Sequence, residues 1–389
     1  MLKVRQQLRG ATSSNLRNFD WTHRGQNWDY TYTVVSPERF DEPKATFALF
    51  PSSSLLSTRE EWRECAEFLC DIGYRCILFD WPGWHQRNIP LNWAIEADVQ
   101  ERTLVSAYTQ FAYTALKHMD ETYSESPLHV AVAGGSAAIH IRRALAEVNI
   151  DKPTNFRSLS CFSPTWRYYL ARCVPEGYPR KFARRQSLAE VLLDTCFVRS
   201  KMMYRIYKSK IGLRKLTKRM YEEPIQSIPE RLESKREVIT RDRPLSIDAA
   251  MITGRFDPVQ STQQFISELF TPSEVTHEGS VSDDDEDDDN LLSIKVPQWA
   301  KIEGGAEDKG MDDDMSSIKI HVVIPEDAVN QDKAEMRVVA DWANHHNATV
   351  SYIPGRIMCH EESPALSASL LDEFVNQSKM TDSSQTLHG

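Results

Sequence analysis

Ser136 has the sequence surroundings of a nucleophilic serine. It lies in Gly134-Gly135-Ser136-Ala137-Ala138, between an apolar run at residues 129–133 and a segment of helical periodicity that continues to Val148. Small neighbours suit a sharp turn from a strand into a helix, in which the serine has a strained backbone and the helix packs close to the strand. The pattern G-x-S-x-A is a variant of G-x-S-x-G. On the five residues alone an ordinary Gly-Gly-Ser turn explains it equally well, and the position between strand and helix favours the nucleophile.

A histidine is needed beside such a serine, because a hydroxyl is a weak nucleophile at neutral pH until a base takes its proton. His360 fits this role, since it lies in the loop that follows the last apolar strand segment at residues 349–353. His345 and His346 end a predicted helix instead. The plainer alternative for His360 is a histidine in a surface loop.

The carboxylate that orients the histidine has two candidates. Asp327 follows the strand segment at residues 318–324, and one helix and one strand separate it from His360, which is the order expected of the orienting acid. Asp257, in Gly254-Arg255-Phe256-Asp257-Pro258, matches the usual acid motif more closely, but a further strand and an acidic insert separate it from His360. Chain order favours Asp327, and Asp257 is then a turn or helix-capping residue.

Two backbone N–H groups are expected to stabilise the oxyanion that forms when the serine attacks a carbonyl. One belongs to Ala137, directly after the serine, and the other to Ser53, in the loop after the first predicted core strand. Backbone donors leave little signature in a sequence, so position alone identifies this loop.

The elements around these residues alternate between strand and helix. Apolar strand segments are predicted at residues 46–50, 76–79, 129–133, 156–162, 318–324 and 349–353. The first helix begins in Ser57-Thr58-Arg59-Glu60, which has the form of a capping box, and ends at Gly73. This alternation predicts an α/β fold, with a mostly parallel sheet and helices on both faces.

Changes in composition divide the chain. We expect a basic N-terminal arm and lead-in (residues 1–44), a first half of the core (45–166), a basic helical cap over the carboxyl edge of the sheet (167–247), a return segment (248–270), an acidic disordered insert (271–317), a second half of the core (318–377) and a disordered tail (378–389). The net charge of -10 conceals two opposite blocks. Residues 271–317 contain fifteen acidic residues and three lysines, whereas residues 167–219 contain fifteen basic and three acidic residues.

Composition also limits the class of protein. The 389 residues, 41% of them hydrophobic, suffice for one large core with an insertion. No apolar run reaches the roughly 18 to 20 residues of a membrane span, so a soluble intracellular protein is expected, in the cytoplasm or the matrix of a plastid or mitochondrion. Seven cysteines without a C-x-x-C pair suit free thiols in a reducing compartment, and neither a metal nor a cofactor is predicted. The first nineteen residues are basic and lack acidic residues, which suits either a mitochondrial-type targeting segment or a disordered arm.

Four segments together resemble the α/β-hydrolase fold-1 superfamily. They are Phe50-Pro51-Ser52-Ser53, Phe79-Asp80-Trp81-Pro82-Gly83-Trp84, the turn at Ser136 and His360-Glu361-Glu362-Ser363-Pro364. The resemblance covers residues 45–165 and 318–377, and it implies an eight-stranded sheet with a cap and hydrolysis through an acyl-enzyme. More narrowly, the residues from Pro51 to Trp62 and the Asp80-Trp81-Pro82-Gly83 motif are similar to a poorly characterised bacterial and plastid branch of that superfamily.

Two functions follow from these residues. The first is a serine esterase or lipase-like hydrolase that cleaves an ester of a small or lipophilic substrate in a pocket under the cap. The second is a catalytically silent protein of the same fold, because Pro51-Ser52 replaces the usual His-Gly, His85 replaces a loop glycine and Pro325-Glu326-Asp327 replaces G-x-x-D. Its basic cap would contact an anionic membrane surface or an acidic protein. No recognition motif for nucleic acid accompanies the charge, which disfavours that partner.

Overall fold

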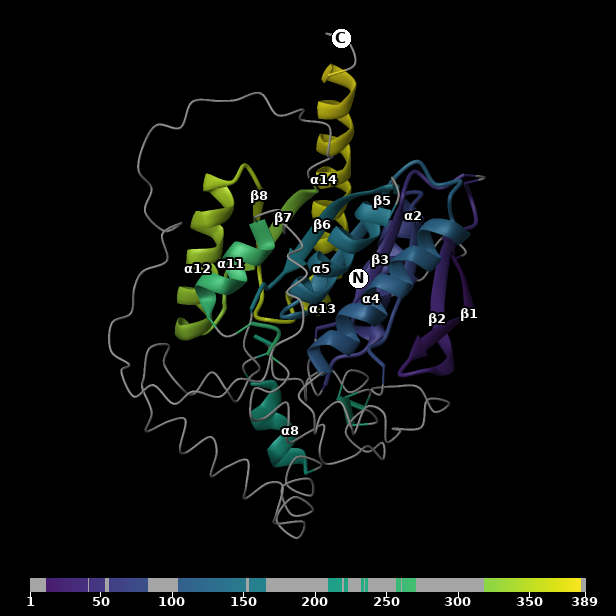
Figure 1. The fold of residues 1–389 in the computed structure, drawn as a ribbon. Helices are drawn as coiled ribbons and strands as arrows, with labels where there is room; N and C mark the ends of the chain where they lie inside the picture. The colour runs from purple at the N-terminus through teal and green to yellow at the C-terminus, as the bar shows by residue number, and fades with distance from the viewer. Residues whose placement is uncertain are drawn as a thin grey trace, which may run out of the picture.

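The computed structural model describes the core of the chain (Figure 1). The described residues are 12–40, 42–52, 56–82, 104–151, 154–165, 209–218, 220–222, 232–233, 235–236, 257–259, 261–270 and 318–385. Residues 1–11, most of the predicted cap, residues 248–256 of the return segment and the acidic insert lie outside this part. The sequence predictions for those segments stay predictions.

An eight-stranded sheet forms the centre of the molecule, in the order β1-β2-β4-β3-β5-β6-β7-β8. The strands are β1 (Thr12–His23), β2 (Gln26–Pro37), β3 (Thr46–Phe50), β4 (Arg75–Leu78), β5 (His129–Gly134), β6 (Phe156–Phe162), β7 (Lys319–Pro325) and β8 (Thr349–Ile353). The pairs β1–β2 and β2–β4 are antiparallel, and the other five pairs are parallel. The predicted mostly parallel, eight-stranded sheet is therefore confirmed, and its last six strands lie within one residue of the predicted segments.

The hairpin of β1 and β2 differs from the sequence prediction, which treated residues 1–44 as an arm and lead-in. Arg24 and Gly25 form its two-residue turn, with φ of 47° and 73°, which suits the turn type that matches the twist of paired strands. Phe19 and Trp21 alternate with polar residues along β1 and pack into the core. Because only every second residue is apolar, this strand lacks the continuous apolar run that marks a strand buried on both faces.

Helices cover both faces of the sheet (Figure 1). One face shares a hydrophobic core with α4 (Leu104–Thr122), α5 (Ala137–Asp151), α11 (Thr262–Phe270) and α12 (Asn330–His345), and the other with α2 (Arg63–Asp71) and α14 (Pro364–Gln385). The helix α14 continues to Gln385. The prediction of a disordered tail at residues 378–389 is therefore wrong for residues 378–385. The two-faced arrangement confirms the predicted α/β layers.

Three short elements lie near the carboxyl ends of the strands. They are η1 (Arg59–Trp62), α13 (Cys359–Glu362) and α8 (Lys210–Thr217), the last being the described helix of the predicted cap. Leu213, Met220 and Tyr221 of the cap segment form a small core with Leu56 and Met358. This segment therefore packs on the loop after β3 and on the loop after β8.

His321 in β7 is a buried histidine that couples folding to pH. Its Nδ1 lies 3.0 Å from Ser160 Oγ and its Nε2 lies 2.9 Å from Ser351 Oγ. Burial lowers the pKa of His321 to about 4, because removal from water penalises the charged imidazolium. The ring is therefore neutral in the folded protein at neutral pH.

We predict that acidification between about pH 6.5 and pH 4 destabilises the fold through His321. The unfolded chain protonates this residue near pH 6.5 and the folded chain only near the lower value, so its contribution is complete above the unfolded pKa and decreases as the pH falls through that window. At pH 5 the loss from this residue is about 2 kcal/mol. Urea unfolding at pH 7 and pH 5 measures it: His321→Gln should show a smaller pH dependence than the wild type, and His345→Gln, at an exposed site, should not. Equal pH dependence in the wild type and His321→Gln would contradict this.

Candidate functional site

The turn between β5 and α5 has its left-handed residue at Gly135, one position before Ser136. The φ angle of Gly135 is 54°, and Ser136 does not have a positive φ. From the sequence we expected the strained conformation at the serine itself, and the difference arises because glycine reaches positive φ without a clash from Cβ. Ser136 lies between this glycine and the first residue of α5, with 7% of its surface exposed.

The loop after β3 lies directly against this turn. A Cβ atom on Gly134 would be 2.5 Å from Ser52 Oγ and 3.1 Å from Ser52 N, so a side chain there would displace the loop. A Cβ atom on Gly135 would be 3.5 Å from Thr165 Oγ1 and 3.6 Å from Ser52 Oγ. Two hydroxyl groups therefore border the turn. Ser53, the predicted oxyanion donor, lies outside the described residues.

The backbone N–H of Ser52 donates a hydrogen bond to a buried carboxylate. This N–H group donates to Glu61 Oε1 at 2.9 Å. The Glu61 side chain, in η1, has no exposed surface, and its Oε2 has no hydrogen-bond partner among the described residues. In the sequence, Glu61 belongs to the segment from Pro51 to Trp62 that carries the resemblance, and no role in the site was predicted for it.

His360 is buried against η1. It lies in the short helix α13 and is 1% exposed, so the alternative of a surface-loop histidine is excluded. Its ring stacks on Trp62, with ring centroids 4.1 Å apart and planes 21° apart. Its Nε2 lies 3.3 Å from Glu61 Oε1. Neither ring nitrogen forms a hydrogen bond to the described part of the chain.

Ser163, the residue after β6, binds the segment that leads to His360. Ser163 has a φ of 49°, a conformation that costs on the order of 1 kcal/mol outside glycine and often marks functional sites. Its Oγ donates to Ile357 O at 2.7 Å and lies 3.4 Å from Cys359 Sγ. Burial raises the pKa of the Cys359 thiol to about 12, so this neighbour is not a competing nucleophile.

Asp327, the preferred acid, contacts the backbone that leads to His360 and not its ring. Its exposed carboxylate accepts the N–H of Gly355 through Oδ2 at 2.9 Å, and its own N–H donates to Gly355 O at 3.0 Å. These bonds join the turn after β7 to the loop after β8. Asp327 therefore lies near the loop that leads to His360, as its place in the chain order predicted. Its carboxylate binds the backbone N–H of Gly355 in that loop and not the imidazole ring.

Asp257, the alternative acid, is half-buried just before α11. The following residue is anchored to α5, because the Arg143 side chain donates to Pro258 O at 3.1 Å. This helix belongs to the core of one face of the sheet, whereas Trp62, on which His360 stacks, belongs to the core of the other. The structure brings neither predicted aspartate into a hydrogen bond with the described His360 ring.

Ala137, the other predicted oxyanion donor, is the first residue of α5 and is fully buried. The first N–H groups of a helix have no partner within it and carry a partial positive charge. This position suits a donor to an anionic oxygen, and that role stays a prediction.

His140 is a second histidine near the serine, one helical turn after it on α5. Its Nδ1 lies 3.2 Å from Thr109 Oγ1. Burial, with a smaller contribution from the charge of Arg143, lowers the pKa of His140 to about 3. A group of such low proton affinity is a poor base at neutral pH. His360 remains the better candidate for activating Ser136.

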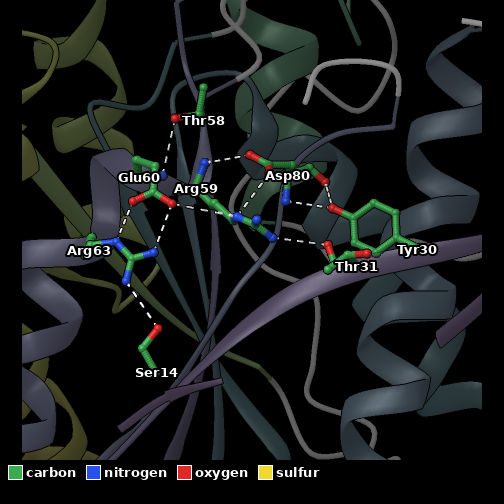
Figure 2. A network of polar contacts seen from close by, with 8 residues as sticks. All are labelled: Ser14, Tyr30, Thr31, Thr58, Arg59, Glu60, Arg63 and Asp80. Carbon is green, nitrogen blue, oxygen red and sulfur yellow. Dashed lines mark hydrogen bonds and ion pairs between the residues drawn. The ribbon is translucent and has the colours of Figure 1, made fainter. Parts of the chain in front are cut away.

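A network of polar contacts fixes η1 and so positions Glu61 (Figure 2). The Arg59 N–H donates to Asp80 Oδ1 at 2.7 Å, and Arg59 Nε lies 3.4 Å from Asp80 Oδ2. The Asp80 N–H, just after β4, donates to the Tyr30 hydroxyl at 2.7 Å, and Arg59 Nη1 donates to Thr31 O at 3.2 Å. These contacts join η1 to β4 and β2.

The comparisons with known proteins identify the fold. No protein-family model and no curated protein sequence matches the chain. Among solved structures, a lipase in its open form is similar over 93% of this chain and 99% of its own length, with 12% identity and a TM-score of 0.55. A probable hydrolytic enzyme from Pseudomonas aeruginosa PAO1 covers 92% and 93%, with 14% identity and a TM-score of 0.52. A carboxyl esterase from Bacillus coagulans covers 93% and 98%, with 11% identity and a TM-score of 0.50. The chain therefore has the α/β-hydrolase fold.

Within the described ranges, no group of three or more His, Cys, Asp or Glu side chains is arranged to hold a metal ion. No helix in that part of the chain is long and apolar enough to cross a membrane.

We predict that Asp80→Asn lowers the free energy of unfolding by about 1 to 3 kcal/mol, because it removes the charge that pairs with Arg59 at a buried position. Urea unfolding at pH 7 measures the change. Glu60→Gln is the matched control, since Glu60 pairs with Arg63 and, at 3.8 Å, with Arg59 but is 41% exposed, so its loss should change stability by no more than about 0.5 kcal/mol. Equal effects of the two substitutions would contradict a role for Asp80 in fixing η1.

Proposed function

We propose that this chain is a serine hydrolase that cleaves an ester of a small or lipophilic substrate through an acyl-enzyme. Ser136 is the nucleophile and His360 is the base. The observation that carries the proposal is the buried His360 ring, 3.3 Å from the buried Glu61 carboxylate, in an α/β-hydrolase fold. Glu61 is linked to the serine turn through Ser52, which lies against Gly134 and Gly135.

In the proposed reaction, Ser136 Oγ attacks the ester carbonyl carbon while its proton passes to His360. The N–H groups of Ala137 and Ser53 stabilise the oxyanion of the tetrahedral intermediate. When the intermediate collapses, the alcohol leaves with the proton from His360. Water then attacks the acyl–serine ester by the same path, which releases the carboxylic acid and restores Ser136.

The packing of the cap segment supports the proposal of a lipophilic substrate. Leu213, Met220 and Tyr221 pack on Leu56 and Met358, which lie in the loops that lead from β3 and β8. Apolar side chains therefore gather beside the loops that carry Ser52 and His360. These apolar surroundings of the proposed site favour an ester with an apolar acyl or alcohol group.

A second candidate is a binding protein of the same fold that does not hydrolyse esters. One observation favours it: the left-handed residue of the turn is Gly135, which has no side chain. In that case Ser136 borders a binding pocket. The basic residues at 167–219 would then contact an anionic membrane surface or an acidic protein.

Labelling with a fluorophosphonate probe, followed by mass spectrometry of the modified peptide, tests the first candidate. We expect the probe on Ser136, and Ser136→Ala should reduce the labelling rate by at least about 1,000-fold, since no other nucleophile replaces the hydroxyl. Ser158→Ala, at a buried serine in β6, is the matched control and should label like the wild type.

Absence of labelling in the folded wild type, or equal labelling of Ser136→Ala, would rule out this hydrolase. The double variant Gly135→Ser/Ser136→Ala then separates the two candidates further. Labelling of the double variant but not of the wild type would favour the binding protein, because a hydroxyl at the left-handed position would be the missing part of the machinery.

A further inference from the structure

The Glu61 carboxylate is a buried charge that the predicted site does not use. Its side chain has no exposed surface, Oε1 accepts one N–H from Ser52, and Oε2 has no partner in the described part of the chain. A carboxylate removed from water needs further donors or a positive charge, because burial otherwise penalises the ionised form. Among the described residues, the group within ion-pair distance is the imidazole of His360, with its Nε2 at 3.3 Å.

We propose that Glu61, and not Asp327 or Asp257, is the carboxylate that positions His360. Its Oε1 lies 3.3 Å from Nε2 and in the working site becomes the acceptor of the Nε2–H, which leaves the lone pair of Nδ1 to receive the proton of Ser136. This inference rests on the proposed function and names the positioning residue of that same site.

In this contact the two ring nitrogens of His360 exchange their usual roles, which are to pair with the acid and to face the serine. In the familiar serine–histidine–acid arrangement, the acid accepts from Nδ1–H and Nε2 faces the serine. Here the carboxylate lies at Nε2, because Glu61 comes from η1 and not from the turn after β7. At 3.3 Å the two atoms are within ion-pair distance, but they form no hydrogen bond in this structure. Such catalytic contacts are often poorly aligned until a substrate binds.

Neighbouring contacts hold both the carboxylate and the ring in place. Trp62, the residue after Glu61, stacks on His360, and its Nε1–H donates to Phe50 O at 3.0 Å. The Ser52 N–H holds Glu61 Oε1 from the same end of β3. One short segment therefore fixes the plane of the imidazole through Trp62 and its edge through Glu61, as a preorganised site requires.

Asp327 has a different task in the same region. Its carboxylate is exposed and accepts the Gly355 N–H, so it acts on the backbone of the loop. Asp327→Asn keeps an oxygen that can accept this N–H and removes only the charge. It is therefore the matched control for Glu61→Gln.

The first measurement is the tautomer of His360, which does not depend on activity. In protein labelled with nitrogen-15 at histidine, the His360 ring resonances are assigned by their loss in His360→Gln. We expect the Nε2–H tautomer in the wild type, resonances that shift in Glu61→Gln and unchanged resonances in Asp327→Asn. An Nδ1–H tautomer in the wild type, or resonances that respond to Asp327→Asn and not to Glu61→Gln, would overturn the pairing.

The second measurement is the rate of fluorophosphonate labelling at Ser136. Glu61→Gln should lower this rate by about 100-fold or more, because the ring loses the charge that stabilises its protonated form, whereas Asp327→Asn should stay within about threefold of the wild type. Glu61→Asp, which keeps the charge on a shorter side chain, should restore part of the loss. Thermal unfolding shows whether each variant is folded.

The outcomes separate the inference from the proposed function. Equal labelling of Glu61→Gln and the wild type would overturn the positioning role and leave the hydrolase proposal standing. Loss of labelling in Asp327→Asn with normal labelling in Glu61→Gln would do the same. If the wild type is not labelled at Ser136, the hydrolase proposal fails and the positioning role fails with it, while the tautomer still decides whether Glu61 pairs with His360.

Discussion

The burial of the Glu61 carboxylate is the constraint around which the site is arranged. A buried charge persists only when polar neighbours compensate for the loss of water, and here these neighbours come from two other parts of the chain. The Ser52 N–H belongs to the loop after β3, and the His360 ring belongs to α13, near the C-terminus of the chain. The same contact therefore brings the loop beside the serine turn and the histidine of the final loop to one place at the edge of the sheet.

The backbone at the strand ends makes this arrangement possible. Gly134 lets Ser52 approach to a distance that any Cβ would prevent, and Gly135 takes the left-handed conformation that turns β5 into α5. Ser163 takes a left-handed conformation at the end of the neighbouring strand and binds the chain before His360. The parallel strands β5 and β6 thus end in two special conformations, one beside the serine and one beside the histidine loop. The sheet positions the site, and a few backbone contacts adjust it.

The fold was largely predictable from the sequence, and the pairing of polar groups was not. Runs of apolar residues identified β3 to β8, because strands buried on both faces need such runs. The hairpin β1–β2 was missed, since its alternating pattern resembles polar chain. Chain order favoured His360 as the base and Asp327 as the acid. It indicates which loop an acid lies in, but not which N–H group that acid binds. Glu61 carried no signal beyond a helix start, and the left-handed angle at Gly135 depends on how β5 enters α5. Both are properties of tertiary contact.

A crystal structure of the wild-type protein, at a resolution that defines the orientation of the imidazole ring, is the most direct test of the central claim. We expect Nε2 of His360 to face Glu61 Oε1 within about 3.3 Å, with the Asp327 carboxylate on the Gly355 N–H. A His360 ring bonded to Asp327 or Asp257, with the Glu61 carboxylate turned to solvent, would contradict it.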